Sequence, residues 1–389
     1  MKEGNGIRLE ALLSNRDTSK TGKFMLLVVF GAGASYDSSM DYSPSVQAVD
    51  RDGLVIQLRA FRPPLANELF DLRGIFANAA EKISKCQLVL NELRSRPTEM
   101  SVEQQLKKLS EQAADYPEGK RQLLAVQFYL QWTISECQAE WNRSIKSHTT
   151  YRPLLGQIDR QRRGEPVCLV TFNYDTLLEE AFSSLNMPFV SIDDYISRSG
   201  YKVIKPHGSV NWVRALTVTS TRRVDSMDQV QMANRIIAIA DTLEPSEDYY
   251  LAPEKDRGAW VISRSSQIPK TSGSYQIVLP AIAIPLEKKT GYACPASHVR
   301  VLEESVSKTE KLLLIGWKGA EYAFVNLLGK RLRKDIPKMI VSSNKQSAMK
   351  IRDAMIEAKL STGVDGWQCA EHGFADTVRS GEIEDFIKR

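Results

Sequence analysis

The sequence predicts an α/β fold, a Rossmann-like parallel sheet with helices on both faces, interrupted by a helical insertion. Two observations predict it. A continuous apolar run from Phe24 to Phe30 enters the glycine-rich segment Gly31–Ser35, as expected of a buried strand that turns into a helix. Further apolar runs followed by polar turns and helical spacing recur after residue 166. Such alternation of strands and helices is typical of a parallel sheet covered on both faces.

Composition places the chain among ordinary globular proteins. Its 389 residues are 42% hydrophobic and 25% charged, which is enough for one large core. The net charge of +5 is spread along the chain, so nucleic acid is expected as an indirect partner at most. No signal pattern opens the sequence, and the first apolar run is far below the ~20 residues that span a bilayer, so we expect a cytoplasmic protein without membrane contact. Five scattered cysteines without a C-x-x-C pair argue against disulfides and structural zinc.

The first half of the chain divides into an arm, a strand, a loop and helices. Residues 1–23 are polar and are expected to form an N-terminal arm, followed by one domain over 24–389. A long loop is expected over 36–62, and a helical insertion over 65–150. Within the insertion, Ser101 and Gln104 have the spacing of a capping box. A long helix, apolar around much of its circumference, is predicted to contain Leu123, Val126, Phe128, Leu130, Trp132 and Ile134.

The second half returns to the sheet. Strands of the parallel sheet are predicted at residues 166–172, 201–205, 277–284, 311–315 and 337–342. Helices are predicted at residues 176–185 and 346–358. A smaller insertion is expected over 214–275, with a helix near 227–240.

Four short polar segments each follow one of these strands: Gly31–Ser35, Asn173–Asp175, His207–Ser209 and Gly316–Trp317. The carboxyl ends of parallel strands share one edge of the sheet, where ligands bind at the reversal of strand order. The four segments are therefore expected to converge on one cleft.

The residue types in these segments suit a polar reaction. His207 is the natural base, because histidine has an unperturbed pKa near neutrality. Asn173 offers a donor and an acceptor, with a helix N-cap as its alternative role, and Asp175 is expected either to cap that helix or to support the site. The N–H groups of Ala32 to Ser35 are expected to bind phosphate, the alternative being a tight turn without a ligand. Tyr36 replaces the third glycine of a dehydrogenase fingerprint, which disfavours that activity.

The order of the motifs resembles the sirtuin superfamily. GAGAS at 31–35, FNYD at 172–175, KPHGS at 205–209 and LLLIGW at 312–317 stand in the order that this family uses, and the resemblance spans residues 24–60 and 166–389. The paired cysteines of the zinc module of sirtuin deacylases are absent from the sequence. With PPLANELF at 63–70 and a helical insertion after it, the chain is more similar to zinc-free sirtuin-like domains of bacterial anti-phage systems.

The resemblance implies a sirtuin-like NAD-binding domain that hydrolyses NAD⁺ to nicotinamide and ADP-ribose without a metal, with Asn173 and His207 catalytic. It also implies that Ser343 and Asn344 contact the adenosine ribose and that Trp317 packs on the adenine, although Trp317 fits the core equally well. The NAD⁺-binding residues that we expect are Gly31, Ala32, Gly33, Ala34, Ser35, Asp37, Tyr174, Asp175, Gly208, Gly316, Trp317, Ser343 and Asn344.

By the same resemblance, the biological role is depletion of NAD⁺ during phage infection. A homo-oligomer is expected, together with a partner that supplies the trigger, either a HerA-like hexameric ATPase or a short Argonaute. Two other functions stay open at this point: NAD-dependent protein deacylation, which the missing cysteines disfavour, and a regulatory module that senses NAD⁺ or ADP-ribose without turnover.

Overall fold

A six-stranded parallel sheet forms the centre of the molecule. The computed structural model describes residues 26–39, 47–49, 55–57, 62–70, 74–97, 99–113, 116–146, 148–216, 228–240, 243–252, 262–263, 276–284, 292–360 and 366–389. The strands of the sheet are β1 (Leu26–Phe30), β4 (Val167–Thr171), β5 (Tyr201–Ile204), β10 (Leu312–Ile315), β11 (Lys338–Val341) and β12 (Trp367–Ala370). The predicted α/β fold is thereby confirmed, and the expected arm at residues 1–23 lies outside the described residues.

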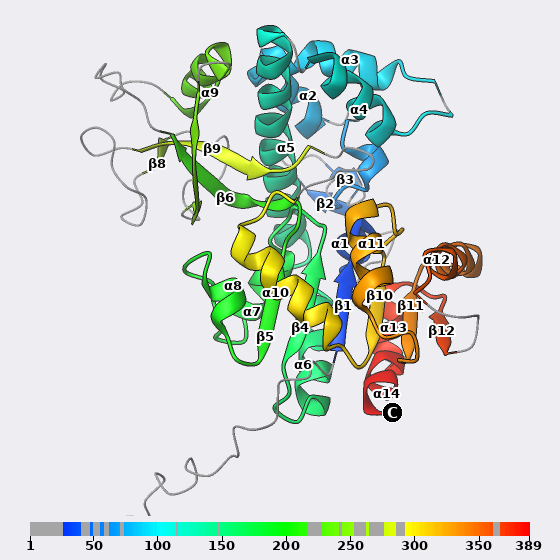
Figure 1. The fold of residues 1–389 in the computed structure, drawn as a ribbon. Helices are drawn as coiled ribbons and strands as arrows, with labels where there is room; N and C mark the ends of the chain where they lie inside the picture. Colours follow the sequence, from blue (N-terminus) through cyan, green and yellow to red (C-terminus); the bar gives the residue numbers. More distant parts are fainter. Residues whose placement is uncertain are drawn as a thin grey trace, which may run out of the picture.

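The strand order of this sheet is β12-β11-β10-β1-β4-β5, and all its neighbouring strands pair in parallel (Figure 1). The chain builds one half outward from β1 through β4 to β5, and then returns to build the other half from β10. Strand order therefore reverses between β1 and β10. This is the arrangement of a doubly wound Rossmann-like sheet, in which the cleft lies beyond the carboxyl ends of the strands at the reversal.

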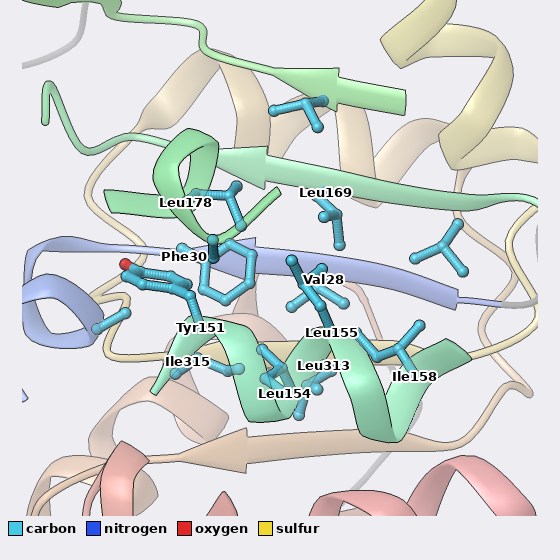
Figure 2. Packing of buried hydrophobic residues seen from close by; sticks show 14 of the residues in the cluster. Val28, Phe30, Tyr151, Leu154, Leu155, Ile158, Leu169, Leu178, Leu313 and Ile315 are labelled. Carbon is cyan, nitrogen blue, oxygen red and sulfur yellow. The ribbon is translucent and has the colours of Figure 1, made fainter. Parts of the chain in front are cut away.

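Alternate residues of β1 face opposite helical layers, as the period of a strand requires. Val28 and Phe30 face one layer, and Leu27 and Val29 face the other. The first layer contains α6 (Tyr151–Gln161), α7 (Leu177–Ser183), α13 (Phe374–Ser380) and α14 (Glu382–Lys388), and Figure 2 shows side chains of α6 packed on the sheet. The second layer contains α10 (Ala296–Ser307), α11 (Tyr322–Arg331) and α12 (Lys345–Glu357). Because both faces are covered, the strands read as continuous apolar runs.

The segment between β1 and β4 is largely helical where it is described. Its elements are α1 (Ala32–Tyr36), the antiparallel pair β2 (Gln47–Val49) and β3 (Val55–Gln57), the 3-10 turns η3 (Ala66–Glu68) and η4 (Ser84–Cys86), and the helices α2 (Gly74–Lys82), α3 (Gln87–Arg94), α4 (Val102–Ala113) and α5 (Pro117–Ser144). The capping box before α4 is confirmed: the Gln104 N–H donates to the Ser101 hydroxyl at 3.1 Å, and the Ser101 N–H donates to Gln104 Oε1 at 3.0 Å. Helix α5 is the long helix that the apolar spacing predicts.

A second, antiparallel sheet leaves the main sheet directly after β5. Its strands are β6 (Gly208–Leu216), β7 (Pro245–Leu251), β8 (Ile262–Ser263) and β9 (Gln276–Ile282), in the order β7-β6-β9-β8, and α9 (Gln229–Ala238) lies between β6 and β7 in the chain. The short helix α8 (Asp194–Ser197) precedes β5. This sheet packs against α5, where Gln131 donates to the Val210 carbonyl at 3.1 Å and Gln127 donates to the Ile282 carbonyl at 2.8 Å.

The prediction that residues 277–284 form a strand of the parallel sheet is wrong in one respect. The strand exists as β9, but it pairs antiparallel with β6 in the second sheet. The sequence pattern was misleading because a strand buried by helix α5 shows the same continuous apolar run as a central parallel strand. Among the described residues, no helix combines the length and the apolar character needed to cross a membrane.

Candidate functional site

A cleft of about 440 Å³ lies beyond the carboxyl ends of β1, β4, β5 and β10. One wall comes from the parallel sheet and its following turns, through Ala32, Ser35, Phe172, Asn173, Tyr174, Asp175, His207, Lys318, Ala320, Glu321 and Ala323. The facing wall comes mainly from the helical segment, through Pro63, Pro64, Ala66, Leu69, Ser101, Glu103 and Ile134. Three of the four polar segments that the sequence predicts to converge contribute lining residues to this cleft. The fourth, Gly316–Trp317, directly precedes the lining residue Lys318.

The carboxamide of Asn173 is held in one orientation by two hydroxyl groups. Its Nδ2 donates to Ser35 Oγ at 2.8 Å and to Tyr151 Oη at 3.3 Å. Its Oδ1 is buried and accepts no hydrogen bond from the described residues. A buried acceptor without a partner is costly, so this oxygen is suited to bind a donor from a ligand or a water molecule in the cleft.

The Ser35 hydroxyl links Asn173 to Tyr151. Its Oγ accepts from the Asn173 amide and lies 2.9 Å from Tyr151 Oη, and either hydroxyl can donate to the other. Burial raises the pKa of the neighbouring Asp175 carboxyl, while the charge of Lys205 and hydrogen bonding by Ser35 and the Leu177 N–H lower it.

The alternative roles expected for Asn173 and Asp175 can now be separated. Helix α7 begins after Thr176, whose N–H donates to Gln138 Oε1 at 2.8 Å. Asp175 Oδ1 accepts from the Leu177 N–H at 3.1 Å, so Asp175 both caps the helix and supports the cleft. Asn173 directs its amide to Ser35 and Tyr151 instead of capping the helix.

His207 lies at the turn between β5 and β6 with its imidazole lining the cleft. The Phe172 ring meets it edge-on at 5.1 Å between centroids, and the Tyr174 ring stacks on it at 5.8 Å. Its backbone carbonyl accepts from the Ala283 N–H at 2.8 Å. The next residue, Gly208, has φ of +73°, and a Cβ there would lie 1.9 Å from the Ala281 carbonyl oxygen, so this turn requires glycine.

The glycines of the β1 turn serve backbone packing. A Cβ on Gly31 would lie 2.6 Å from the Gly316 carbonyl oxygen, and a Cβ on Gly316 would lie 2.3 Å from the Ala34 nitrogen. The Gly33 N–H donates to the Gly316 carbonyl at 3.1 Å, and the Ala34 N–H donates to the Gly31 carbonyl at 2.9 Å. Two of the N–H groups predicted to bind phosphate are therefore already engaged by the backbone.

Trp317 and Asp37, both expected to contact NAD⁺, have partners within the protein. Trp317 is 2% exposed and stacks on Phe172 at 5.8 Å between ring centroids. Of its two expected roles, this burial favours that of a core residue. The Asp37 carboxylate accepts from the backbone N–H groups of Phe374 at 2.7 Å and Ala375 at 3.3 Å, at the start of α13.

Ser343 and Asn344 lie outside the lining of this cleft. They follow β11, as predicted, but they are not among the described residues that line the cleft. Asn344 Oδ1 accepts from the Ser347 N–H at 2.9 Å and so caps α12. Asparagine is a preferred N-cap residue, so its position between a strand and a helix does not by itself distinguish a cap from a ligand contact.

Sequence reasoning missed two groups at the cleft. Tyr151 has no local signal, because it opens α6 and reaches Asn173 through the fold. Glu321 lines the cleft opposite Glu103 of α4, and burial raises its pKa to about 7, with a further upward contribution from the Glu103 charge. The indole N–H of Trp317 donates to Glu321 and opposes this shift. Within the described ranges, no group of three or more histidine, cysteine, aspartate or glutamate residues is placed to hold a metal ion.

Comparison with known proteins gives one family match. A family model described as a SIR2-like domain matches residues 167–244, and sequence comparison with curated proteins finds no match. Among solved structures, a Sir2 homologue in complex with NAD is 14% identical over 94% of this chain and 88% of that chain, with a TM-score of 0.37. A mutant Sir2 homologue in complex with ADP-ribose is 12% identical over 93% and 91%, with a TM-score of 0.39. The SIR2-like segment runs from β4 into the second sheet, and it contains both Asn173 and His207.

Proposed function

We propose that the protein is an NAD⁺ hydrolase that cleaves the bond between nicotinamide and ribose. The observation that carries this proposal is the buried Asn173 Oδ1, which has no hydrogen-bond partner among the described residues and lies in the same cleft as His207. The position of the cleft at the reversal of strand order is the usual place for a dinucleotide in such a sheet. The SIR2-like match over the segment that supplies both residues supports the same substrate.

In the proposed reaction, Asn173 Oδ1 accepts a hydrogen bond from the attacking water or from a ribose hydroxyl. The bond between ribose C1′ and the nicotinamide nitrogen breaks, and its electron pair leaves with nicotinamide, which becomes neutral. Water adds to C1′ and gives ADP-ribose. The proton that water loses passes to His207, directly or through a ribose hydroxyl, and is then released to solvent.

The surroundings of His207 suit a cationic transition state. Phe172 and Tyr174 present aromatic rings to the imidazole, and Leu69 and Ile134 of the facing wall are apolar. Such a lining limits bulk water around the ribose, so the positioned water competes well for C1′. Ser35 and Tyr151 keep the Asn173 amide in the productive orientation before the substrate arrives.

The test is nicotinamide release from NAD⁺ by the purified full chain, alone and with the products of its neighbouring genes, measured by chromatography. We expect His207→Ala to lower turnover by about 10²- to 10⁴-fold, as for loss of a general base. Asn173→Ala is expected to lower turnover while leaving the fold intact. His372→Ala is the matched control, because the His372 side chain is 60% exposed and lies outside the cleft lining.

Each other result identifies a different function. Unchanged turnover in His207→Ala contradicts the assignment of the base. Tight NAD⁺ binding without nicotinamide release identifies a sensing module. Nicotinamide release that requires an acylated lysine peptide identifies a deacylase.

We propose further, on the resemblance of the motif order, that this hydrolysis depletes NAD⁺ in cells infected by phage. The chain would then act as a homo-oligomer whose partner protein, a HerA-like hexameric ATPase or a short Argonaute, supplies the trigger. Cells that express the chain with its neighbouring genes are expected to lose NAD⁺ on infection, and cells with the His207→Ala chain are expected to keep it. Equal NAD⁺ levels in the two strains would contradict this role.

A further inference from the structure

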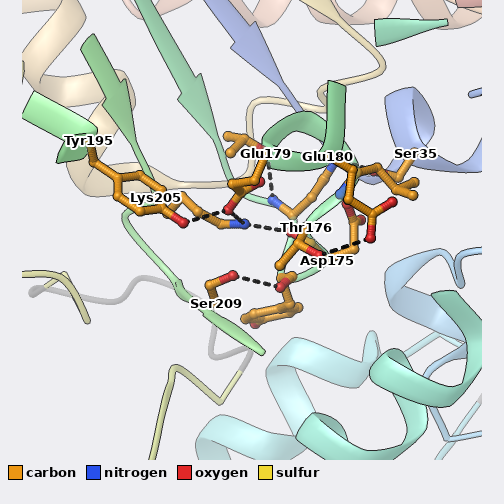
Figure 3. Close-up of polar contacts among 12 residues, drawn as sticks. Ser35, Asp175, Thr176, Glu179, Glu180, Tyr195, Lys205 and Ser209 are labelled. Atoms are coloured by element: carbon orange, nitrogen blue, oxygen red, sulfur yellow. Dashed lines mark hydrogen bonds and ion pairs between the residues drawn. The ribbon is translucent and has the colours of Figure 1, made fainter. Parts of the chain in front are cut away.

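Lys205 is a fully buried lysine two residues before His207. Its side chain is 0% exposed, and its Nζ donates to Glu179 Oε1 at 2.8 Å and to the backbone carbonyl of Asp175 (Figure 3). Glu179 is also buried, and its Oε1 accepts a second hydrogen bond from Tyr195 Oη at 3.0 Å. The ion pair therefore lies directly beneath the cleft, between the turns that carry Asn173 and His207.

The two turns are joined on both sides of His207. Before it, Lys205 binds the Asp175 carbonyl. After it, Ser209 Oγ donates to the Tyr174 carbonyl at 3.2 Å, and the Val210 N–H donates to the same oxygen at 2.9 Å. Residues on both sides of His207 are thus bound to the carbonyls of Tyr174 and Asp175, the two residues that follow Asn173.

Stability alone does not explain this ion pair. A buried charge pair is often no more stabilising than apolar side chains of similar volume, because both charges lose their hydration. Here Glu179 Oε2 has no hydrogen-bond partner among the described residues, so the pair is incompletely satisfied. Lys205 lies in the turn directly after β5, and an apolar side chain at this position could not donate to the Asp175 carbonyl.

We propose that Lys205 and Glu179 are positioning residues, which hold the His207 turn against the Asn173 turn so that the two side chains share one substrate geometry. This inference rests on the proposed function for its kinetic consequence. Glu179 and Tyr195 orient the Lys205 ammonium, and the ammonium fixes the Asp175 carbonyl. The pair should therefore control the rate of the chemical step more than the affinity for NAD⁺.

The decisive variant is the double substitution Lys205→Met with Glu179→Gln, which removes both charges and keeps similar shapes. The glutamine side chain can still accept from Tyr195, whereas the methionine side chain cannot donate to the Asp175 carbonyl. We expect kcat to fall about 10- to 100-fold, the range for a small misplacement of reacting groups, while KM stays near that of the parent. A double variant that is folded and has the parental kcat would overturn the proposal.

Lys338→Met is the matched control. Lys338 is also buried in the parallel sheet, at 1% exposure, and its Nζ donates to the carbonyls of Lys334 and Ile336, each at 2.8 Å. It begins β11, far from the carboxyl ends of the strands, so its loss is expected to lower stability while kcat and KM stay unchanged. An equal fall of kcat in Lys338→Met and in the double variant would show that general destabilisation causes the loss of activity. That result would reject the proposal.

A spectroscopic measurement separates this proposal from the proposed function. The chain has four histidines, so the His207 imidazole signal can be assigned by its loss in His207→Ala. We expect its chemical shift and titration midpoint to change in the double variant and to stay parental in Lys338→Met. If the parent releases no nicotinamide, alone or with the products of its neighbouring genes, the proposed function fails. The positioning role is then judged by this signal, and a signal identical in the parent and the double variant rejects it.

Discussion

The amide nitrogen of Asn173 lies 2.8 Å from the Ser35 hydroxyl, although 138 positions separate the two residues in the chain. This contact joins the turn after β1 to the turn after β4, which are neighbouring parallel strands. Ser35 of the first predicted motif thus holds the side chain of Asn173 in the second motif. The Ser35 hydroxyl positions the amide proposed to be catalytic, while two N–H groups of its own turn are occupied by the backbone.

Ser35→Ala is expected to impair turnover by releasing the Asn173 amide. The substitution leaves one N–H of the buried Asn173 amide without an acceptor and removes a partner of the Tyr151 hydroxyl, which costs about 1–3 kcal/mol of stability. The freed amide can rotate, so kcat is expected to fall about tenfold or more in the nicotinamide-release assay. Ser305→Ala is the control, because Ser305 is also buried but donates to the Val301 carbonyl at 2.7 Å within α10. A parental kcat in Ser35→Ala would contradict the role given to this hydroxyl.

Glu321→Gln is expected to stabilise the protein at high pH and not at low pH. Burial raises the pKa of Glu321 from 4.5 to about 7, so between these values the folded chain holds a proton that the unfolded chain releases. Stability is therefore lost as pH rises through this range. Glutamine cannot ionise, so the variant should match the parent at about pH 4 and have the higher thermal midpoint at about pH 8. Parallel midpoint curves for the two proteins would show that Glu321 titrates normally.

Gly316→Ala is expected to destabilise the fold through a backbone clash. Gly316 has φ of +58°, and its Cβ would lie 2.3 Å from the Ala34 nitrogen. The φ value alone costs about 1–2 kcal/mol in an alanine. Gly366→Ala isolates that cost, because Gly366 has φ of +82° and no atom within 4 Å of a Cβ. Urea unfolding should therefore show a larger loss for Gly316→Ala, and equal losses would rule out the close approach.

Asp37→Ala is expected to lower stability and to spare NAD⁺ binding. The carboxylate accepts from the N–H groups of Phe374 and Ala375, and loss of such a helix cap costs about 0.5–2 kcal/mol. Asp37→Asn keeps an acceptor oxygen and should lose less. Calorimetric titration with NAD⁺ checks that binding is spared. A large fall in NAD⁺ affinity in both variants would show that Asp37 contacts the ligand.

The apolar runs predicted the central sheet because both of its faces are covered by helices. β1, β4 and β10 are fully buried over their lengths, and each appears in the sequence as consecutive apolar residues. β12 was missed because three of its four residues are partly exposed at the sheet edge. The strand at 277–284 was assigned to the wrong sheet, since an apolar run does not reveal which strand it pairs with.

The candidate site was predictable where one residue type and its place after a strand suffice, as for His207 and Asn173. It was not predictable where a role depends on a distant partner. Tyr151 acts on Asn173 through the packing of α6 on the sheet, and Lys205 is neutralised by Glu179 from α7. Asp37 and Asn344 each accept from backbone N–H groups at the start of a helix, a role that the sequence pattern did not distinguish from ligand binding.

His207 is the last residue before the chain leaves the parallel sheet, because β6 of the antiparallel sheet begins at Gly208. The same strand is fastened to α5 by Gln131. His207 thus lies at the junction of the two sheets, so a change in how the antiparallel sheet packs on α5 would shift the backbone that carries its imidazole.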